Sequence, residues 1–362
     1  MNRLFFELIQ IALDQSEKLP HDLSDREWME LFNWSNKQAI AGITFAALDK
    51  LDKKGQKPPV PLIYEWFGST QIIRARNARL DDHCKNLIEL LSQKNIRCSI
   101  LKGQGLARYY DENLRQLRQA GDIDVYVNCG LKEAISLAHA LGQTDLEWDY
   151  QHLHLNLWPD VEIEVHYRAE ILFNLNKNKQ LQKWFKDNQE SLFSKEGELI
   201  VPSVYTNLVY VLLHIYRHFL TEGVGLRQLM DYYFVLKKAK GSFEVYADGK
   251  TLVETLKSFG LFRFTQGLMW VLQEVFCLER NLMICDPIEK EGAFILSEVM
   301  SGGNFGHYDE RLNHRKGKIS TFMDIVKHNM RLFSHYPADS IWASLWLVFH
   351  RQWKIKTRLA LQ

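Results

Sequence analysis

The sequence predicts an α+β fold in which a small mixed sheet lies between helical regions at the two ends of the chain. Three observations support this prediction. Apolar residues recur with the helical period over residues 1–95 and again from 171 onward. Between these regions, short segments alternate apolar and polar residues as strands do. Clusters of glycine and proline separate the two patterns.

The N-terminal region, residues 1–80, is expected to be helical. Ser24 and Glu27 have the S-x-x-E spacing of a capping box, which predicts that a helix begins there. Glycine and proline residues interrupt the helical period at 51–61. A long helix is then expected from about residue 62 to residue 94.

The middle region, residues 81–170, should contain the sheet. The expected elements, in chain order, are a strand at 96–101, the start of a helix at 106–110, a strand at 122–127, a helix at 131–142 and a hairpin of strands 152–158 and 161–167. A hairpin turn around Pro159 predicts three cross-strand pairs, which are Leu157 with Val161, Leu155 with Ile163, and His154 with Glu164.

The C-terminal region, residues 171–362, should again be helical. Turns are expected at 196–203, 222–225, 301–306 and 334–340, where glycine, proline and serine gather. The most apolar stretch, residues 341–349, is too short for a membrane span and is expected to be a core helix.

Composition narrows the class of protein. Of the 362 residues, 46% are hydrophobic, which is enough to form a core. The net charge is only +1, so the chain has no strong positive field that would attract a nucleic-acid backbone. The five cysteines are odd in number and include no C-x-x-C pair. We therefore expect reduced thiols in a cytoplasmic protein, without a cysteine-type zinc site and without a membrane span.

Two aspartates in the strand at 122–127 call for an explanation, because strand interiors disfavour this residue. Asp122 and Asp124 lie on one face of the strand, opposite an apolar face of isoleucine and valine. In the strand at 161–167, Glu162 and Glu164 share the corresponding polar face. Two solvated carboxylates at a strand end would be the simplest interpretation. Carboxylates gathered on one sheet face also suit Mg²⁺, which prefers oxygen ligands.

A second motif, Lys102-Gly103-Gln104-Gly105, follows the strand at 96–101 and precedes an expected helix. Glycines at such a junction let backbone N–H groups approach a phosphate, and the lysine adds a positive charge. By itself the motif is also compatible with a simple turn.

Together these segments resemble a known family. The blocks LKGQGLARYY, RQAGDIDVYV and VEIEVHYR resemble the DNA polymerase β-type nucleotidyltransferase superfamily. More narrowly, they are similar to a bacterial nucleotidyltransferase-like family with KG…GDID…E-h-H-[WY] blocks. The segments HIYRHFLTEGVGLRQLMDY and GGNFG are similar to the helical half of that family, so the resemblance covers roughly residues 85–310.

The resemblance implies a mixed-sheet palm at 81–170, bound Mg²⁺ and transfer of a nucleotidyl group from an NTP. It implies that Asp122, Asp124 and Glu164 are the catalytic and metal-binding carboxylates. Glu162 shares the polar face and is the alternative to Glu164, which is preferred because it precedes the V-H-Y block. The glycine motif departs from the family pattern, since Gln104 follows Gly103 in place of glycine or serine.

The predicted nucleotide-binding set is Lys102, Gly103, Gln104, Gly105, Arg118, Arg227 and Asp231. Arg227 and Asp231 are four residues apart on an expected helix, so an intrahelical ion pair is an equal alternative for them. The histidines near these motifs are interpreted as hydrogen-bonded and partly buried in preference to ligands; they are His154, His166, His214 and His218.

We therefore expect an Mg²⁺-dependent nucleotidyltransferase that moves an NMP from an NTP to an unidentified acceptor. The acceptor could be a small molecule, a protein side chain or an RNA end. Two alternatives belong to other classes. One is a catalytically silent NTP-binding or toxin–antitoxin-type module, and the other is a scaffold for protein interactions.

Overall fold

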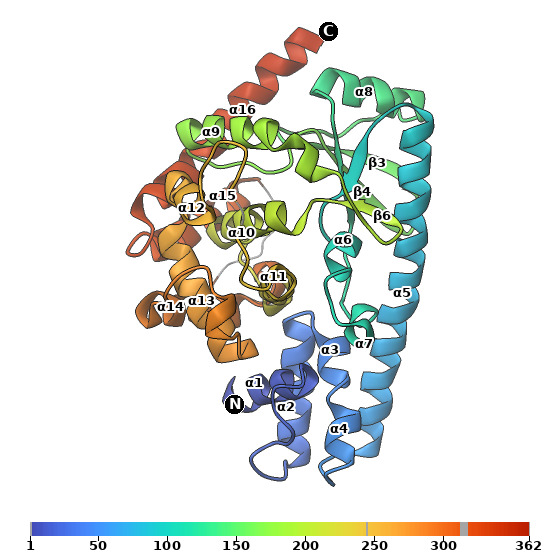
Figure 1. The fold of residues 1–362 in the computed structure, drawn as a ribbon, viewed down its shortest axis with the longest axis vertical. Helices are drawn as coiled ribbons and strands as arrows, with labels where there is room; N and C mark the ends of the chain where they lie inside the picture. Colours follow the sequence, from blue (N-terminus) through green and yellow to red (C-terminus); the bar gives the residue numbers. More distant parts are fainter. Residues whose placement is uncertain (1, 244, 312–317, 362) are drawn as a thin grey trace.

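A four-stranded mixed sheet lies between helical regions, as the sequence predicts (Figure 1). The computed structural model describes residues 2–243, 245–311 and 318–361. The sheet strands are β1 (Cys98–Ile100), β2 (Ile123–Val127), β3 (His152–Trp158) and β4 (Val161–His166). Their order is β1-β2-β4-β3, with β2 and β4 parallel and the two outer pairs antiparallel.

Helices before and within the sheet region are α1 (Asn2–Ala12), α2 (Asp25–Lys37), α3 (Ala41–Phe45), α4 (Leu48–Asp52), α5 (Val60–Gln93), α6 (Gln104–Ala107), α7 (Glu112–Arg115) and α8 (Leu131–Ala140). The predicted capping box is confirmed at the start of α2, where the Ser24 hydroxyl accepts a hydrogen bond from the N–H of Glu27 and the Glu27 carboxylate accepts one from the N–H of Ser24.

Helices and short strands after the sheet are α9 (Leu175–Asp187), η1 (Gln189–Leu192), β5 (Ser194–Glu196), β6 (Leu199–Val201), α10 (Val204–Thr221), α11 (Leu226–Ala239), α12 (Leu252–Phe259), α13 (Phe262–Phe276), η2 (Arg280–Leu282), α14 (Glu289–Gly302), η3 (Asn304–Gly306), α15 (Lys318–Leu332) and α16 (Pro337–Leu361). Within the described ranges, no helix is both long and apolar enough to cross a membrane.

The hairpin register is confirmed at one end and wrong at the other. Leu155 pairs with Ile163 and His154 with Glu164, as expected. Val161, however, pairs with Trp158 and not with Leu157. A register shift between Leu155 and Trp158 accounts for the difference, because an extra residue in one strand displaces the pairs beyond it.

Helix α5 connects the two hydrophobic cores of the protein. It runs along one side of the molecule, from the N-terminal helices to the sheet (Figure 1). Leu62 and Trp66, in its first half, belong to the large core of the helical regions. Leu80 and Leu87, in its second half, belong to the core beneath the sheet. The sheet is thereby fixed to the N-terminal helices by a continuous element.

The C-terminal region is not purely helical. Residues 196–203, expected to be only a turn, contain part of a β-hairpin formed by β5 and β6. Gly197 has a positive φ of 60° at the hairpin turn, which glycine adopts without steric cost. Leu199 and Val201 are buried in the core beneath the sheet. The hairpin was missed because its strands have only three residues each.

Residues 341–349 were expected to be a core helix, and this expectation is half wrong. They lie in α16, where Ala343 and Trp346 are buried. Ile341, Leu345 and Val348 point outward and are each about half exposed, at 49%, 51% and 59%. Only one face of α16 packs on the rest of the protein. The apolar composition of residues 341–349 therefore did not reveal that the other face of the helix is exposed.

Gly105 has a packing role. A Cβ atom at this position would lie 2.6 Å from the carbonyl oxygen of Ile100, closer than real contacts allow. Residue 105 therefore has to be glycine for α6 to lie against the end of β1.

We predict that Gly105→Ala lowers the free energy of unfolding by about 1–3 kcal/mol, because a backbone atom must move to admit the methyl group. The matched control is Gly68→Ala in α5, where a Cβ would meet nothing within 4 Å. That substitution should leave stability unchanged or raise it by up to about 1 kcal/mol. Urea unfolding of the three proteins measures both effects, and equal stabilities would contradict the packing role.

Candidate active site

The carboxylates singled out in the sequence lie on two adjacent parallel strands. Asp124 in β2 pairs in register with Glu164 in β4. Asp122 lies immediately before β2, two residues ahead of Asp124. The opposite face of both strands consists of isoleucine and valine that pack in the core beneath the sheet. Burial of this apolar face fixes which side chains point to the polar face.

Asp124 is the buried centre of this group. It is only 2% exposed, which excludes a solvated strand end. The Lys102 Nζ lies 2.6 Å from its Oδ1, and the His166 Nε2 lies 2.9 Å from the same oxygen. Burial opposes ionisation of Asp124, yet the charge of Lys102 and the hydrogen bond from His166 outweigh it and lower its pKa to about 2.

His166 connects Asp124 to Glu164. Its Nε2 also lies 3.2 Å from the Glu164 Oε2, while its Nδ1 lies 3.3 Å from the amide nitrogen of Gln151. The imidazole is buried, which disfavours its charge, but its hydrogen bonds to the two carboxylates raise its pKa to about 9. Burial likewise opposes ionisation of Glu164, and the hydrogen bond from His166 reverses this effect and lowers the pKa of Glu164. Both carboxylates are thus held ionised.

Glu162 occupies a different environment from Glu164. Its side chain is 60% exposed, and its Oε1 lies 2.6 Å from the Nδ1 of His154. Glu164 is 18% exposed at the side chain and level with Asp124. The ligand atoms of Asp124, Glu164 and His166 all lie within 4.8 Å of one another. Of the two glutamates, Glu164 is therefore the one placed to act together with Asp124.

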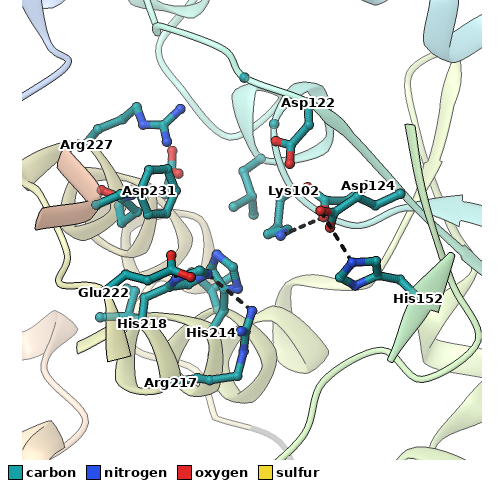
Figure 2. A pocket seen from close by; sticks show the side chains of 18 of the residues that line it. Lys102, Asp122, Asp124, His152, His214, Arg217, His218, Glu222, Arg227 and Asp231 are labelled. Atoms are coloured by element: carbon teal, nitrogen blue, oxygen red, sulfur yellow. Dashed lines mark hydrogen bonds and ion pairs between the residues drawn. The ribbon is translucent and has the colours of Figure 1, made fainter. Parts of the chain in front are cut away.

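Asp122 faces an open cavity of about 570 Å³ between the sheet and helices α10 and α11 (Figure 2). The negative charge of Asp124 is the main cause that raises the pKa of Asp122 to about 6, and burial adds to it. The residues that line the cavity are Lys102, Gly103, Leu106, Arg118, Gly121, Asp122, Asp124, Asp149, His152, Glu164, Val211, His214, Ile215, Arg217, His218, Glu222, Arg227, Gln228, Asp231, Phe305 and His307.

Arg118 and Asp231 form a buried ion pair that joins the loop before β2 to α11. The Nε of Arg118 lies 2.7 Å from Oδ1 of Asp231, and its Nη2 lies 2.7 Å from Oδ2. The Tyr110 hydroxyl donates a further hydrogen bond to Asp231 at 2.7 Å. The intrahelical pair of Arg227 with Asp231, which was the equal alternative for these residues, is absent from the described ion pairs, and Asp231 instead has two buried partners, Arg118 and Tyr110.

Arg227 instead faces the cavity (Figure 2). Its Nη1 donates to the carbonyl oxygen of Gln119 at 2.9 Å, and its guanidinium lies over the ring of Phe305 at 5.4 Å. The buried Nε of Arg227 and Nη1 of Arg118 have no hydrogen-bond partner among the described residues. Both side chains line the cavity, but these two nitrogens have no exposed surface there, so it is the positive charge of the guanidinium groups that favours a phosphate.

Glycines allow the Phe305 loop to reach this position. Gly223 has a φ of 101°, and a Cβ there would lie 3.2 Å from the backbone of Gly306. A Cβ on Gly225 would lie 2.9 Å from the backbone of Asn304. The segments 222–225 and 303–306 are thus in backbone contact, which places Phe305 beneath Arg227.

The glycine motif is only partly at the cavity. Lys102 and Gly103 line it, and Gly103 has a positive φ of 54°. Gln104 and Gly105 do not line it, contrary to their assignment as nucleotide-binding residues. The Gln104 amide is buried and donates to Asp81 at 2.8 Å and to the Asn77 carbonyl at 3.2 Å, so it holds α6 against α5. Gly105 instead packs closely against the backbone of Ile100.

The prediction missed several residues of the cavity wall, notably His152, Arg217 and Glu222. His214 and His218 do line the cavity, whereas His154 points to Glu162 at the surface. Arg217 follows His214 by three residues on α10 and so shares its face, a spacing that could have revealed it.

Glu170 is a second omission, because it joins the sheet region to α10. It is fully buried, accepts a hydrogen bond from Arg217 Nε at 2.8 Å and lies 3.2 Å from His214 Nδ1. Gln151 donates to the same carboxylate at 3.3 Å and also contacts His166. A chain of polar contacts therefore runs from Asp124 through His166 and Gln151 to α10.

The donor set fits a hard divalent cation. Asp122, Asp124 and Glu164 supply carboxylate oxygens to one cavity, and the negative charge of Asp124 raises the pKa of Asp122 although Lys102 opposes this effect. The closest contacts of Lys102 and His166 with Asp124 are both to Oδ1, so Oδ2 is the oxygen of that side chain suited to a metal. Oxygen ligands of this kind are those that Mg²⁺ prefers.

Comparison with protein families agrees with this arrangement. A family described as "Uncharacterised nucleotidyltransferase" matches residues 24–277. The chain belongs to this nucleotidyltransferase family. No curated protein and no solved structure matches the chain. The matched segment includes the sheet, its carboxylates and both helices of the cavity wall, while Phe305 and His307 lie beyond it.

The raised pKa of Asp122 generates a prediction for the metal-free nucleotidyltransferase. A carboxyl whose pKa is higher in the folded state than in the unfolded state costs stability once it ionises, so this cost grows as pH rises from about 4 to about 6. Asp122→Asn removes the cost. Its melting temperature in EDTA should exceed that of the unaltered protein by about 1–3 °C above pH 6, and the difference should vanish near pH 4.

The control for this measurement is Asp145→Asn, which alters an exposed carboxyl outside the cavity. Its melting curve should follow that of the unaltered protein at every pH. A loss of stability in Asp122→Asn throughout the range would identify Asp122 as a structural residue.

Proposed function

We propose that the protein is an Mg²⁺-dependent nucleotidyltransferase that transfers an NMP from an NTP to a hydroxyl acceptor. The single observation that carries the proposal is the cavity in which Asp124 and Glu164, paired on adjacent strands, and Asp122, immediately before β2, lie together with the guanidinium groups of Arg118 and Arg227. Family membership supports the reaction class. The strand positions of the carboxylates agree with the resemblance to the polymerase β-type superfamily.

Charge balance supports a role for a divalent cation. Among the described residues, six carboxylates line the cavity and four lysine or arginine side chains oppose them, so this part of the wall has two excess negative charges if its histidines are neutral. An NTP adds several more negative charges to this space. Mg²⁺ would offset them, as it does where carboxylates and substrate phosphates share the ion.

The proposed roles follow from position. Asp122, Asp124 and Glu164 would hold Mg²⁺, which when bound stabilises charge on the attacking and leaving oxygens. Arg118 and Arg227 would place positive charge beside the phosphates, since both line the cavity. Lys102 keeps Asp124 ionised and lies beside Gly103, whose backbone borders the same space.

In the proposed reaction the acceptor oxygen forms a bond to the α-phosphorus of the NTP. The bond from that phosphorus to the bridging oxygen of the β-phosphate breaks, and pyrophosphate leaves with the electron pair. The hydroxyl proton is released to solvent. The lowered pKa of Glu164 suits a permanent ligand better than a proton acceptor.

A catalytically silent NTP-binding module is the second candidate. The contacts of Lys102 and His166 favour it, because they already satisfy Asp124 without a metal. Both candidates bind NTP, and only the enzyme releases pyrophosphate and labels an acceptor.

The first test is calorimetric titration with ATP, GTP, CTP and UTP, each with and without Mg²⁺. We expect at least one NTP to bind tightly only in the presence of the ion, because the carboxylates repel the triphosphate otherwise. Absence of metal-dependent binding for all four nucleotides would refute the proposal. Transfer of label from the bound α-labelled NTP to an extract then separates the enzyme from the silent module.

The second test compares Glu164→Gln with Glu162→Gln. We expect the first to lower the transfer rate at least about 100-fold, since even residues behind a metal ligand cost about 10–100-fold when altered. The second removes an exposed contact with His154 and should change the rate by no more than about threefold. Label transfer from the NTP measures both. If the effects are reversed, Glu162 is the third ligand.

A further inference from the structure

A second cavity of about 640 Å³ lies next to the first. The two cavities share six wall residues, which are Asp149, His152, Arg217, Glu222, Phe305 and His307. Figure 2 labels three of these, His152, Arg217 and Glu222, around the first cavity. The volume is within the range of about 300–1,000 Å³ that holds small-molecule ligands.

The second cavity is continuous with the Glu164 side of the candidate active site. His152 is in both walls, and its Nε2 lies 3.5 Å from the Glu164 Oε1. Arg118 and Arg227, the proposed phosphate-binding residues, line only the first cavity. A molecule in the second cavity would therefore reach Glu164 by way of His152, outside the part of the first cavity that Arg118 and Arg227 line.

The second cavity has an apolar part formed by residues that do not line the first cavity. Phe173, Ile325, Trp346 and Leu347 line it, and the last three come from α15 and α16. Phe173 and Trp346 are each only 7% exposed, with ring centroids 5.8 Å apart. Such a wall suits a ring or another apolar body.

The polar part of the wall disfavours an anion. Among the described residues, the carboxylates of Asp149, Glu222 and Asp324 line the second cavity together with one guanidinium, that of Arg217. Two imidazole nitrogens on this wall, Nδ1 of His152 and Nε2 of His350, are buried without a hydrogen-bond partner among the described residues. A polyanion such as an RNA end would be repelled, whereas hydroxyl or amino groups would find acceptors and donors.

We infer that the second cavity binds the acceptor, and that the acceptor is a small hydroxyl compound, neutral or cationic, with an apolar body. The inference rests on the proposed function and names the acceptor class of the same site. The apolar body lies against Trp346 and Leu347, and the hydroxyl points past His152 toward Glu164. The acceptor oxygen forms a bond to the α-phosphorus, the bond from that phosphorus to pyrophosphate breaks, and the proton of the acceptor hydroxyl goes to solvent.

The test uses Leu347→Arg, with Val348→Arg as its control. Leu347 lines only the second cavity, and Val348 is 59% exposed on the same helix. An arginine at 347 is larger than leucine and adds a positive charge to the cavity wall, so it should lower transfer at least about tenfold, while binding of the Mg²⁺–NTP complex stays unchanged. Val348→Arg should leave both unchanged. Ile325→Trp, which fills the cavity without charge, should repeat the loss.

The acceptor class is tested with a metabolite extract that is separated by ion exchange into anionic, neutral and cationic pools before the reaction. Each pool, and a protein and an RNA fraction, is then incubated separately with the protein, Mg²⁺ and α-labelled NTPs. We expect label in the neutral or cationic pool. Label in the anionic pool, in protein or in RNA, or in no fraction although NTP binds, would overturn the acceptor inference. So would weaker NTP binding by Leu347→Arg, because the second cavity would then hold the base. Failure of the unaltered protein to bind any Mg²⁺–NTP would instead overturn the proposed function itself.

Discussion

The site depends on one buried carboxylate, that of Asp124. An ionised carboxylate at 2% exposure is costly unless positive groups surround it, and Lys102 and His166 supply them. Each of these partners is fixed in turn, Lys102 by the end of β1 and His166 by β4 and Gln151. The need to neutralise Asp124 therefore determines how three segments of the sheet region meet.

The cavity belongs to the sheet and the helical region together. Arg118 bonds to Asp231 of α11, and Glu170 bonds to Arg217 of α10, so two buried ion pairs cross the boundary between them. Breaking a buried pair from one side leaves an unpaired charge, which costs about 3–5 kcal/mol. Neither half presents the complete set of cavity residues alone. The candidate active site thus depends on an interface that polar contacts hold in register.

Sequence patterns predicted the sheet side of the site better than its helical side. Alternation placed Asp122, Asp124 and Glu164 on the polar face, because a buried apolar face leaves a strand only one orientation. Helical spacing suggested that Arg227 could pair with Asp231 within α11. Asp231 instead binds Arg118, which is 113 residues away from it in sequence. Local spacing cannot reveal such long-range competition. The hairpin bulge and the packing role of Gly105 were hidden for the same reason, since both depend on tertiary contacts.

Helix α5 has a consequence for how the protein loses its structure. With 34 residues it is about 51 Å long at the usual rise per residue, and its two halves are embedded in different cores. If either core opened, half of this helix would lose its packing surface, and an isolated helix gains little stability from its own hydrogen bonds. The cores are therefore coupled in unfolding, and backbone amides near the middle of α5 should exchange with solvent only when the whole chain opens.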